Sequence, residues 1–188
     1  MSNPILTRRE LLMTTALIAG ATAVPLPALA ETVSPAASDG ALEAMRCWEE
    51  AVNEATAAGE PIIVVEDSDI ERGRNVETRY SVSSTRRVNG QALNSFTTVA
   101  GQPEVVRAIA VYWVSDSGLI TTLEDTWLQG TASSVAHCTY SYTKLDGGQT
   151  LAVNYTATLT NYVDFNQAFY FYAEFYEDGS GWMNGGWL

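Results

Sequence analysis

The strongest constraint on the fold is an alternation of apolar and polar residues on both sides of the segment 145–149 (LDGGQ). Before this segment, Tyr140 and Tyr142 alternate with polar neighbours, and after it Leu151, Val153 and Tyr155 do the same. Successive side chains of a β-strand point to opposite faces, so this pattern predicts two strands, each with one buried face. The glycine pair between them predicts a short turn, and the whole segment is therefore expected to be an antiparallel hairpin.

Further strands are predicted from similar runs of β-branched and aromatic residues. The segment 105–114 (VVRAIAVYWV) is apolar almost throughout, as expected for a central strand that is covered on both faces. The dipeptide Asn89-Gly90 is the preferred sequence of a tight hairpin turn, and we expect it to lead into a strand at 92–99. The remaining predicted strands lie at 61–65, 76–82, 119–128 and 169–176.

One helix is predicted, at residues 40–58. Apolar residues recur there every three or four positions, with glutamates on the opposite face, as in an amphipathic helix. Asp39 is the expected N-cap, and Gly59 followed by Pro61 is a typical helix stop. The apolar stripe contains Ala41, Ala44, Trp48, Ala51 and Ala55.

These elements predict a mainly β fold: an antiparallel meander of about eight strands with one N-terminal amphipathic helix packed on it. Sequential hairpins without β-α-β alternation are typical of a sandwich or a closed barrel, and the pattern leaves both open. We predict three parts in the chain of 188 residues, which are an export signal at 1–30, a tether at 31–38 and a single β-rich domain at 39–188.

The first thirty residues have the features of a cleavable export signal. Arg8 and Arg9 precede an apolar stretch at 11–24, and Ala28 and Ala30 supply small residues for cleavage. The apolar stretch is shorter than the roughly 20 residues that a membrane-spanning helix needs, so we expect no permanent span. The segment 7–12 (TRRELL) resembles a twin-arginine translocation signal, with an ordinary Sec leader as the alternative. The expected location is outside the cytoplasm of a bacterium: secreted, periplasmic or on the cell surface.

The chain has two cysteines, Cys47 and Cys138. In an exported protein the expected arrangement is one structural disulfide, and Cys138 falls on the apolar face of its strand, where it could meet a helix packed over the sheet. The alternative is a pair of buried thiols. One histidine and two separated cysteines do not have the spacing of a metal site, so no metal and no cofactor is predicted.

Charge and motifs exclude several classes of function. A net charge of -12 and a pI near 4.3 leave no basic surface for nucleic acid. The only histidine, His137, is expected to point outward, and no nucleophile motif accompanies it. Acidic groups that could serve a hydrolase or bind calcium are more simply explained as solvated charge. They are Glu124 with Asp125, Glu174 with Glu177 and Asp178, and the loop residues Asp67, Asp69 and Glu71.

The most suggestive feature is a group of aromatic residues near the C-terminus. If Phe169, Phe171 and Phe175 fill the core, the alternating tyrosines of the same strand face outward or into a pocket. The alternative is that the glycine-rich tail folds back and its tryptophans cover a sheet edge. The expected ligand-binding residues are Tyr170, Tyr172, Tyr176, Trp182 and Trp187.

The resulting hypothesis is an exported, non-catalytic binding protein that uses this aromatic surface. The partner could be a protein, a glycan or a small apolar ligand. Two alternatives remain: a carrier with an internal pocket, and a small carboxylate hydrolase.

Overall fold

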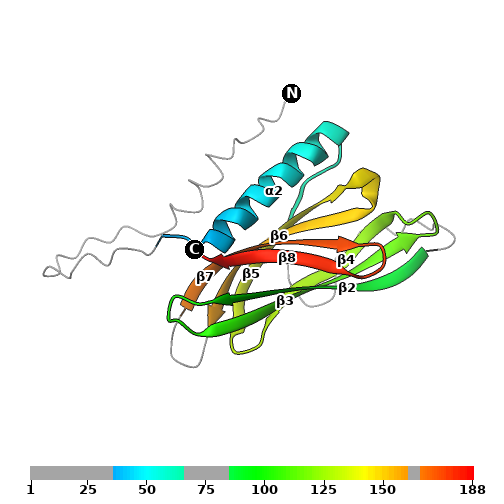
Figure 1. The fold of residues 1–188 in the computed structure, drawn as a ribbon. Coiled ribbons are helices and arrows are strands. Elements are labelled where there is room, and N and C mark those ends of the chain that lie inside the picture. Colours follow the sequence, from blue (N-terminus) through cyan, green and yellow to red (C-terminus); the bar gives the residue numbers. More distant parts are fainter. Residues whose placement is uncertain (1–35, 66–84, 161–165) are drawn as a thin grey trace, which may run out of the picture. The chain divides into compact units, whose positions relative to one another are not determined.

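A computed structural model describes residues 36–65, 85–160 and 166–188, and these form one α-helix, a short 3-10 helix and eight strands (Figure 1). The predicted leader, the strand at 76–82 and the acidic loop at 67–71 lie outside the described residues. The elements, in chain order, are α2 (Asp39–Ala58), β1 (Ile63–Val65), β2 (Thr85–Thr97), β3 (Pro103–Ser115), β4 (Ile120–Gly130), β5 (Ser134–Leu145), η2 (Asp146–Gly148), β6 (Thr150–Thr160), β7 (Asn166–Tyr176) and β8 (Gly181–Trp187).

The strands form two antiparallel sheets. One has the order β1-β5-β6-β7-β8 and the other the order β2-β3-β4, so the prediction of a mainly β fold built from sequential hairpins is confirmed. The expected turn at 145–149 joins β5 to β6 through η2. Within the described residues no strand of one sheet is paired with a strand of the other, and a closed barrel is not formed.

The main core lies between the two sheets. Phe169, Phe171 and Phe175 of β7 point into it and are at most 1% exposed, as the alternation predicted. Tyr112 of β3 and Tyr155 of β6 fill its middle and are completely buried. Such large side chains bury much apolar surface, which is the main stabilising contribution in a domain of this size.

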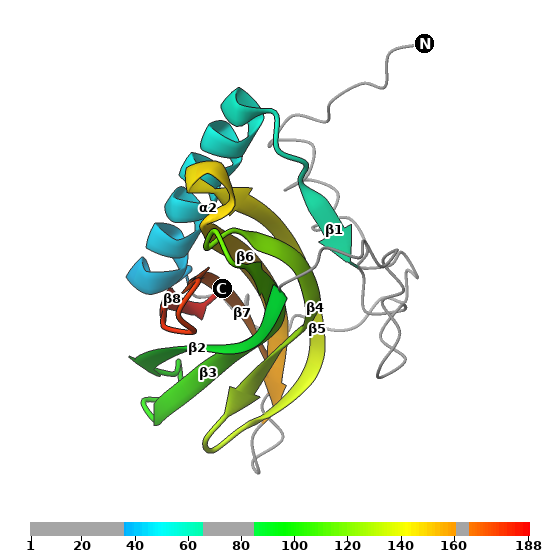
Figure 2. The same cartoon turned by 90° about the vertical axis from the view of Figure 1, so that its right-hand side faces the viewer.

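Helix α2 covers the other face of the five-stranded sheet (Figure 2). Its buried residues Ala41, Ala44, Ala51 and Ala55 are small, so the helix can lie close to the strands. The hydroxyl of Ser38 accepts the Ala41 N–H, which makes Ser38 the N-cap and moves the start of the helix by one residue from the predicted one. Helix α2 therefore encloses a second, smaller core with Leu145, Ala152 and Tyr172.

The prediction of a hairpin turn at Asn89-Gly90 was wrong. Both residues lie inside β2 and pair with Val111 and Ala110 of β3. A Cβ atom on Gly90 would lie 2.7 Å from the ring of Tyr112 and 2.8 Å from that of Phe175. Glycine stands here because two core rings occupy the space of a side chain, and not because the chain reverses.

The predicted disulfide is also absent: Cys47 and Cys138 are not bonded to each other. Cys138 pairs with Ala157 and packs against the core between the sheets, as the strand phase indicated. Cys47 belongs to the smaller core under α2, on the opposite face of the same sheet. The helix packs on the face away from Cys138, so the five-stranded sheet separates the two sulfur atoms.

The apolar segment at 105–114 is the central strand β3. Described residues cover its inner face completely and its outer face only in part, where Val111 is 5% exposed. Val106, Ala108, Ala110, Tyr112 and Val114 are completely buried between the sheets. Ile109 and Trp113 point to the other side and are half-buried. In the described part of the chain no helix or strand packs over this outer face.

Candidate functional site

Four of the five predicted aromatic residues, all except Trp187, lie on the side of the five-stranded sheet that carries α2. Trp182 of β8 lies directly opposite Glu174 of β7, so the two side chains share one face. Tyr172 and Tyr176 share that face by alternation along β7, and Trp48 of α2 packs above it. We call these five residues, Trp48, Tyr172, Glu174, Tyr176 and Trp182, the Trp182 surface.

Trp182 is the exposed part of this surface. Its side chain is 44% exposed, and its ring meets the ring of Tyr172 edge-on, with centroids 6.1 Å apart. Tyr172 is only 2% exposed and lies 6.4 Å from Trp48 of the helix. The exposed indole ring is thus supported by Tyr172, which in turn packs against the half-buried Trp48. A ring that is already immobilised loses little entropy when a partner covers it.

Glu174 is held in a fixed position beside this ring. The hydroxyl of Tyr172 donates to one carboxylate oxygen at 2.7 Å, and the hydroxyl of Tyr176 donates to the other at 2.9 Å. Burial, and then the hydrogen bond to Glu174, raises the pKa of Tyr172 far above its usual value and that of Tyr176 to about 12. Both phenols therefore stay protonated at neutral pH and continue to orient the carboxylate.

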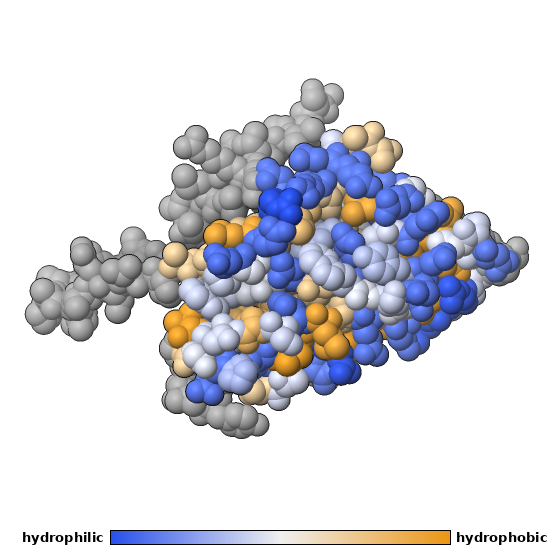
Figure 3. All heavy atoms as spheres, viewed as in Figure 1, coloured by the Kyte–Doolittle hydropathy of each residue, from blue (hydrophilic) through white to orange (hydrophobic). Residues whose placement is uncertain are grey.

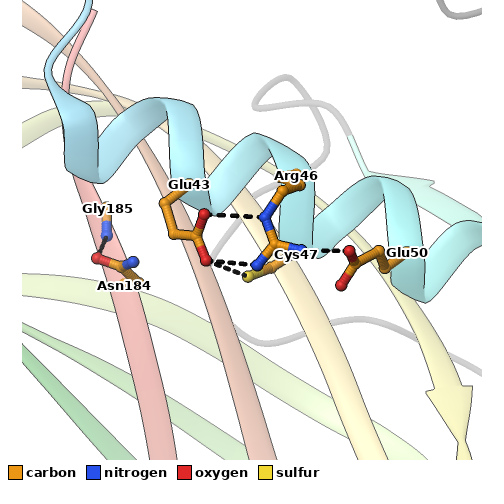
Figure 4. A network of polar contacts seen from close by, with 6 residues as sticks. All are labelled: Glu43, Arg46, Cys47, Glu50, Asn184 and Gly185. Atoms are coloured by element: carbon orange, nitrogen blue, oxygen red, sulfur yellow. Dashed lines mark hydrogen bonds and ion pairs between the residues drawn. The ribbon is translucent and has the colours of Figure 1, made fainter.

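One flank of α2 adds further charge (Figure 4). Arg46 bonds Glu43 at 2.9 Å through Nε and also bonds Glu50. The contact with Arg46 lowers the pKa of Glu43. Burial, followed by the charge of Glu43, raises the pKa of the Cys47 thiol, and Cys47 also senses the charge of Glu174. A thiol with a raised pKa is a poor nucleophile.

Not every residue predicted for the aromatic site is available to a partner. The alternation was right, since Tyr170 and Tyr172 point away from the phenylalanine core, but α2 covers them, and Tyr172 is buried. Trp187 points the other way and packs against the core between the sheets. The expected aromatic row is therefore reduced to Trp182 and the half-buried Tyr176. The space-filling view shows pale side chains of intermediate hydropathy in the middle of this face and hydrophilic atoms along the helix (Figure 3).

Among the described residues, which do not include Asp67, Asp69 and Glu71, no three acidic, histidine or cysteine side chains are grouped so that they could hold a metal ion. Glu124 forms a paired contact with Arg87, at 2.8 and 3.0 Å, which lowers the pKa of Glu124, whereas burial raises that of Asp125. The carboxylate of Asp178 accepts two bonds from Ser180 in the β7–β8 turn. These contacts are structural. His137 is exposed on β5, as predicted.

A small groove of about 200 Å³ opens where β4 approaches β5 and β1. Its polar groups are already engaged, because Lys144 Nζ donates to the Thr121 carbonyl at 2.8 Å and Thr143 donates to the Pro61 carbonyl at 2.9 Å. The Lys144 bond joins the two sheets, and the Thr143 bond ties the residues before β1 to β5. We therefore assign the groove a structural role.

Sequence reasoning missed a second apolar surface, on the outer face of β2, β3 and β4. Leu93 is 55% and Trp127 is 40% exposed there. The almost continuous apolar sequence of β3 could have indicated this surface, because such a sequence is typical of a strand covered on both faces. We call this surface the β2–β4 face. Its members are Arg87, Asn89, Gln91, Leu93, Arg107, Ile109, Val111, Trp113, Glu124, Asp125, Trp127 and Gln129.

Comparison with models of protein families, with curated proteins and with solved structures finds no match to this chain. The two surfaces are therefore the features of this chain that indicate a function. In the part of the chain that the structure describes, no helix combines the length and the apolar character needed to cross a membrane.

Proposed function

We propose that this chain is an exported, non-catalytic binding protein that holds its partner on the Trp182 surface. The observation that supports this proposal is the exposed indole of Trp182, held by Tyr172 and placed next to an oriented carboxylate. Tryptophans fixed in this way are common anchors of protein interfaces. Export is proposed from the leader, with Arg8 and Arg9 ahead of a short apolar stretch.

The charge of the surroundings favours a partner with a cationic group. Glu174 lies directly beside Trp182, α2 carries Glu43 and Glu50 around the single cation Arg46, and the whole chain has a net charge of -12. A guanidinium or ammonium group is attracted to the face of an indole ring and to nearby carboxylates at the same time. A basic segment of a protein is therefore the partner class that we propose.

The filled interior does not favour the alternative of a carrier. Tyr112, Tyr155 and Phe171 occupy the space between the sheets and are completely buried. The sequence left a sandwich and a closed barrel open, and we favour the sandwich. Two facing sheets packed on a filled core are the defining features of that architecture.

The test is binding of a short arginine-rich peptide, measured by calorimetry with the wild type, Trp182→Ala and Trp127→Ala. We expect Trp182→Ala to weaken binding about fivefold, because a partly desolvated cation–π contact contributes roughly 1 kcal/mol. Trp127→Ala is the matched control, since its side chain has nearly the same exposure but belongs to the β2–β4 face. It should bind as the wild type does.

Equal binding by both variants would mean that the peptide is attracted only by the diffuse negative charge, and the proposal would fail. A hexaglutamate peptide should not bind. Tyr172→Ala is unsuitable as a test, because this residue is buried under α2 and its removal would disturb the fold.

A further inference from the structure

The β2–β4 face carries apolar side chains on all three strands, among polar neighbours such as Gln91 and Gln129. Ile109, Val111 and Trp113 of β3 point to this side, and their neighbours include Trp127 on β4 and Leu93 on β2. Trp127 and Leu93 are 40% and 55% exposed. Strands that are apolar on both faces are typical of sheets with a layer on each side. Within the described residues this face has no second layer.

Charge distinguishes this face from the rest of the protein. Arg87 is neutralised by Glu124, and the face carries one further cation, Arg107, and one further anion, Asp125. Both are exposed, and among the described residues Arg107 forms no ion pair. The face is thus neutral in a chain with a net charge of -12. Two acidic molecules repel each other least where such neutral faces meet.

The two charges occupy positions that complement each other in a second copy. The register places Arg107 on one side of the Ile109–Trp127 pair and Asp125, which is opposite Val111, on the other side. A two-fold axis that crosses the strands at the Ile109–Trp127 row would exchange the two ends of the face. Each Arg107 would then lie over the Val111–Asp125 end of the other copy, and the two Trp127 rings would meet at the axis.

We propose that the protein forms a symmetric homodimer through the β2–β4 face. The occupant is a second copy rather than a basic partner, because the face is neutral and carries one charge of each sign in a self-complementary arrangement. This inference is independent of the Trp182 surface, which lies on the opposite side of the fold and stays open in the dimer.

Sedimentation equilibrium of the full chain tests the proposal, and we expect a dimer with a micromolar dissociation constant. Trp127→Ala should raise that constant at least tenfold, because this side chain lies at the axis. Trp182→Ala is the matched control and should leave it unchanged. If Trp127→Ala does not fold, Leu93→Ala repeats the test with a smaller change. Its matched control is Leu42→Ala on the exposed side of α2, since the two leucines are 55% and 53% exposed.

A charge exchange tests the geometry itself. Arg107→Asp and Asp125→Arg should each weaken the dimer about tenfold, because each places like charges opposite one another. The double variant restores the pair with reversed sign and should recover most of the affinity. A monomer at all accessible concentrations, or a dimer that none of these substitutions affects, would overturn the proposal. Two weakened single variants without recovery in the double variant would overturn the proposed axis.

Discussion

Raising the pH above 10 should unfold this protein cooperatively, with the transition complete by about pH 12. Tyr112, Tyr155 and Tyr172 are at most 2% exposed. Burial raises the pKa of Tyr112 from 10.0 to about 12, and it raises those of Tyr155 and Tyr172 further. An unfolded chain exposes these phenols to water, where they ionise near pH 10.

The sign of the effect follows from proton binding in the two states. Above pH 10 the unfolded state loses protons that the folded state keeps, so the free energy of unfolding falls as the pH rises. The stabilisation is complete below pH 10 and is lost as the pH approaches the folded pKa values. Three tyrosines together give a slope of roughly 4 kcal/mol per pH unit, since one proton contributes about 1.4 kcal/mol. Two pH units therefore remove about as much as a typical domain stability of 5–15 kcal/mol.

The measurement is phenolate absorbance and far-ultraviolet circular dichroism over the same pH series. The two signals should change together, because the buried phenols ionise only when the fold opens. Tyr155→Phe removes one of the three groups and should reduce the slope by about a third. It should also cost about 1 kcal/mol at neutral pH, since the Tyr155 hydroxyl bonds Thr126 at 2.6 Å. Ionisation of most tyrosines with unchanged circular dichroism would contradict the burial on which the prediction rests.

Local alternation in the sequence predicts most of this fold. The hairpin around 145–149, the inward phase of Cys138 and the phenylalanines of β7 follow from a period of two, because each strand has one face in the core. The helix also follows from its own spacing and from Gly59, which adopts the left-handed conformation at its end.

What the sequence does not reveal is which face of a sheet receives which layer. The periodicity of a strand or helix shows on which side of that element Tyr172 or Cys47 lies. It does not show that α2 covers the side of the five-stranded sheet away from Cys138. That choice buries Tyr172, separates the cysteines and leaves Trp182 as the exposed part of the predicted site. The placement of α2 depends on packing between residues that are far apart in the sequence, and local patterns do not predict such packing.

Gly90→Ala should destabilise the protein by about 2–3 kcal/mol, measured as the free energy of unfolding in denaturant. The added methyl group would lie 2.7 Å from Tyr112 and 2.8 Å from Phe175, both of which are completely buried and cannot move away cheaply. In a tight Asn-Gly turn the same change would also be costly, because such a turn needs a left-handed backbone at both of its central residues. The loss of stability at Gly90 therefore tests the close packing of the two rings, and the neighbouring position separates the strand from the turn.

Asn89→Ala is the control at the neighbouring position. Asn89 is exposed on the outer face of β2, so its replacement should change stability by no more than about 0.5 kcal/mol. In a tight hairpin turn the same replacement would be costly, because asparagine tolerates the left-handed backbone that such a turn requires. The strand and the turn thus give opposite expectations at Asn89. A large loss of stability for Asn89→Ala would contradict the continuous strand β2 and would return Asn89-Gly90 to a turn between two strands.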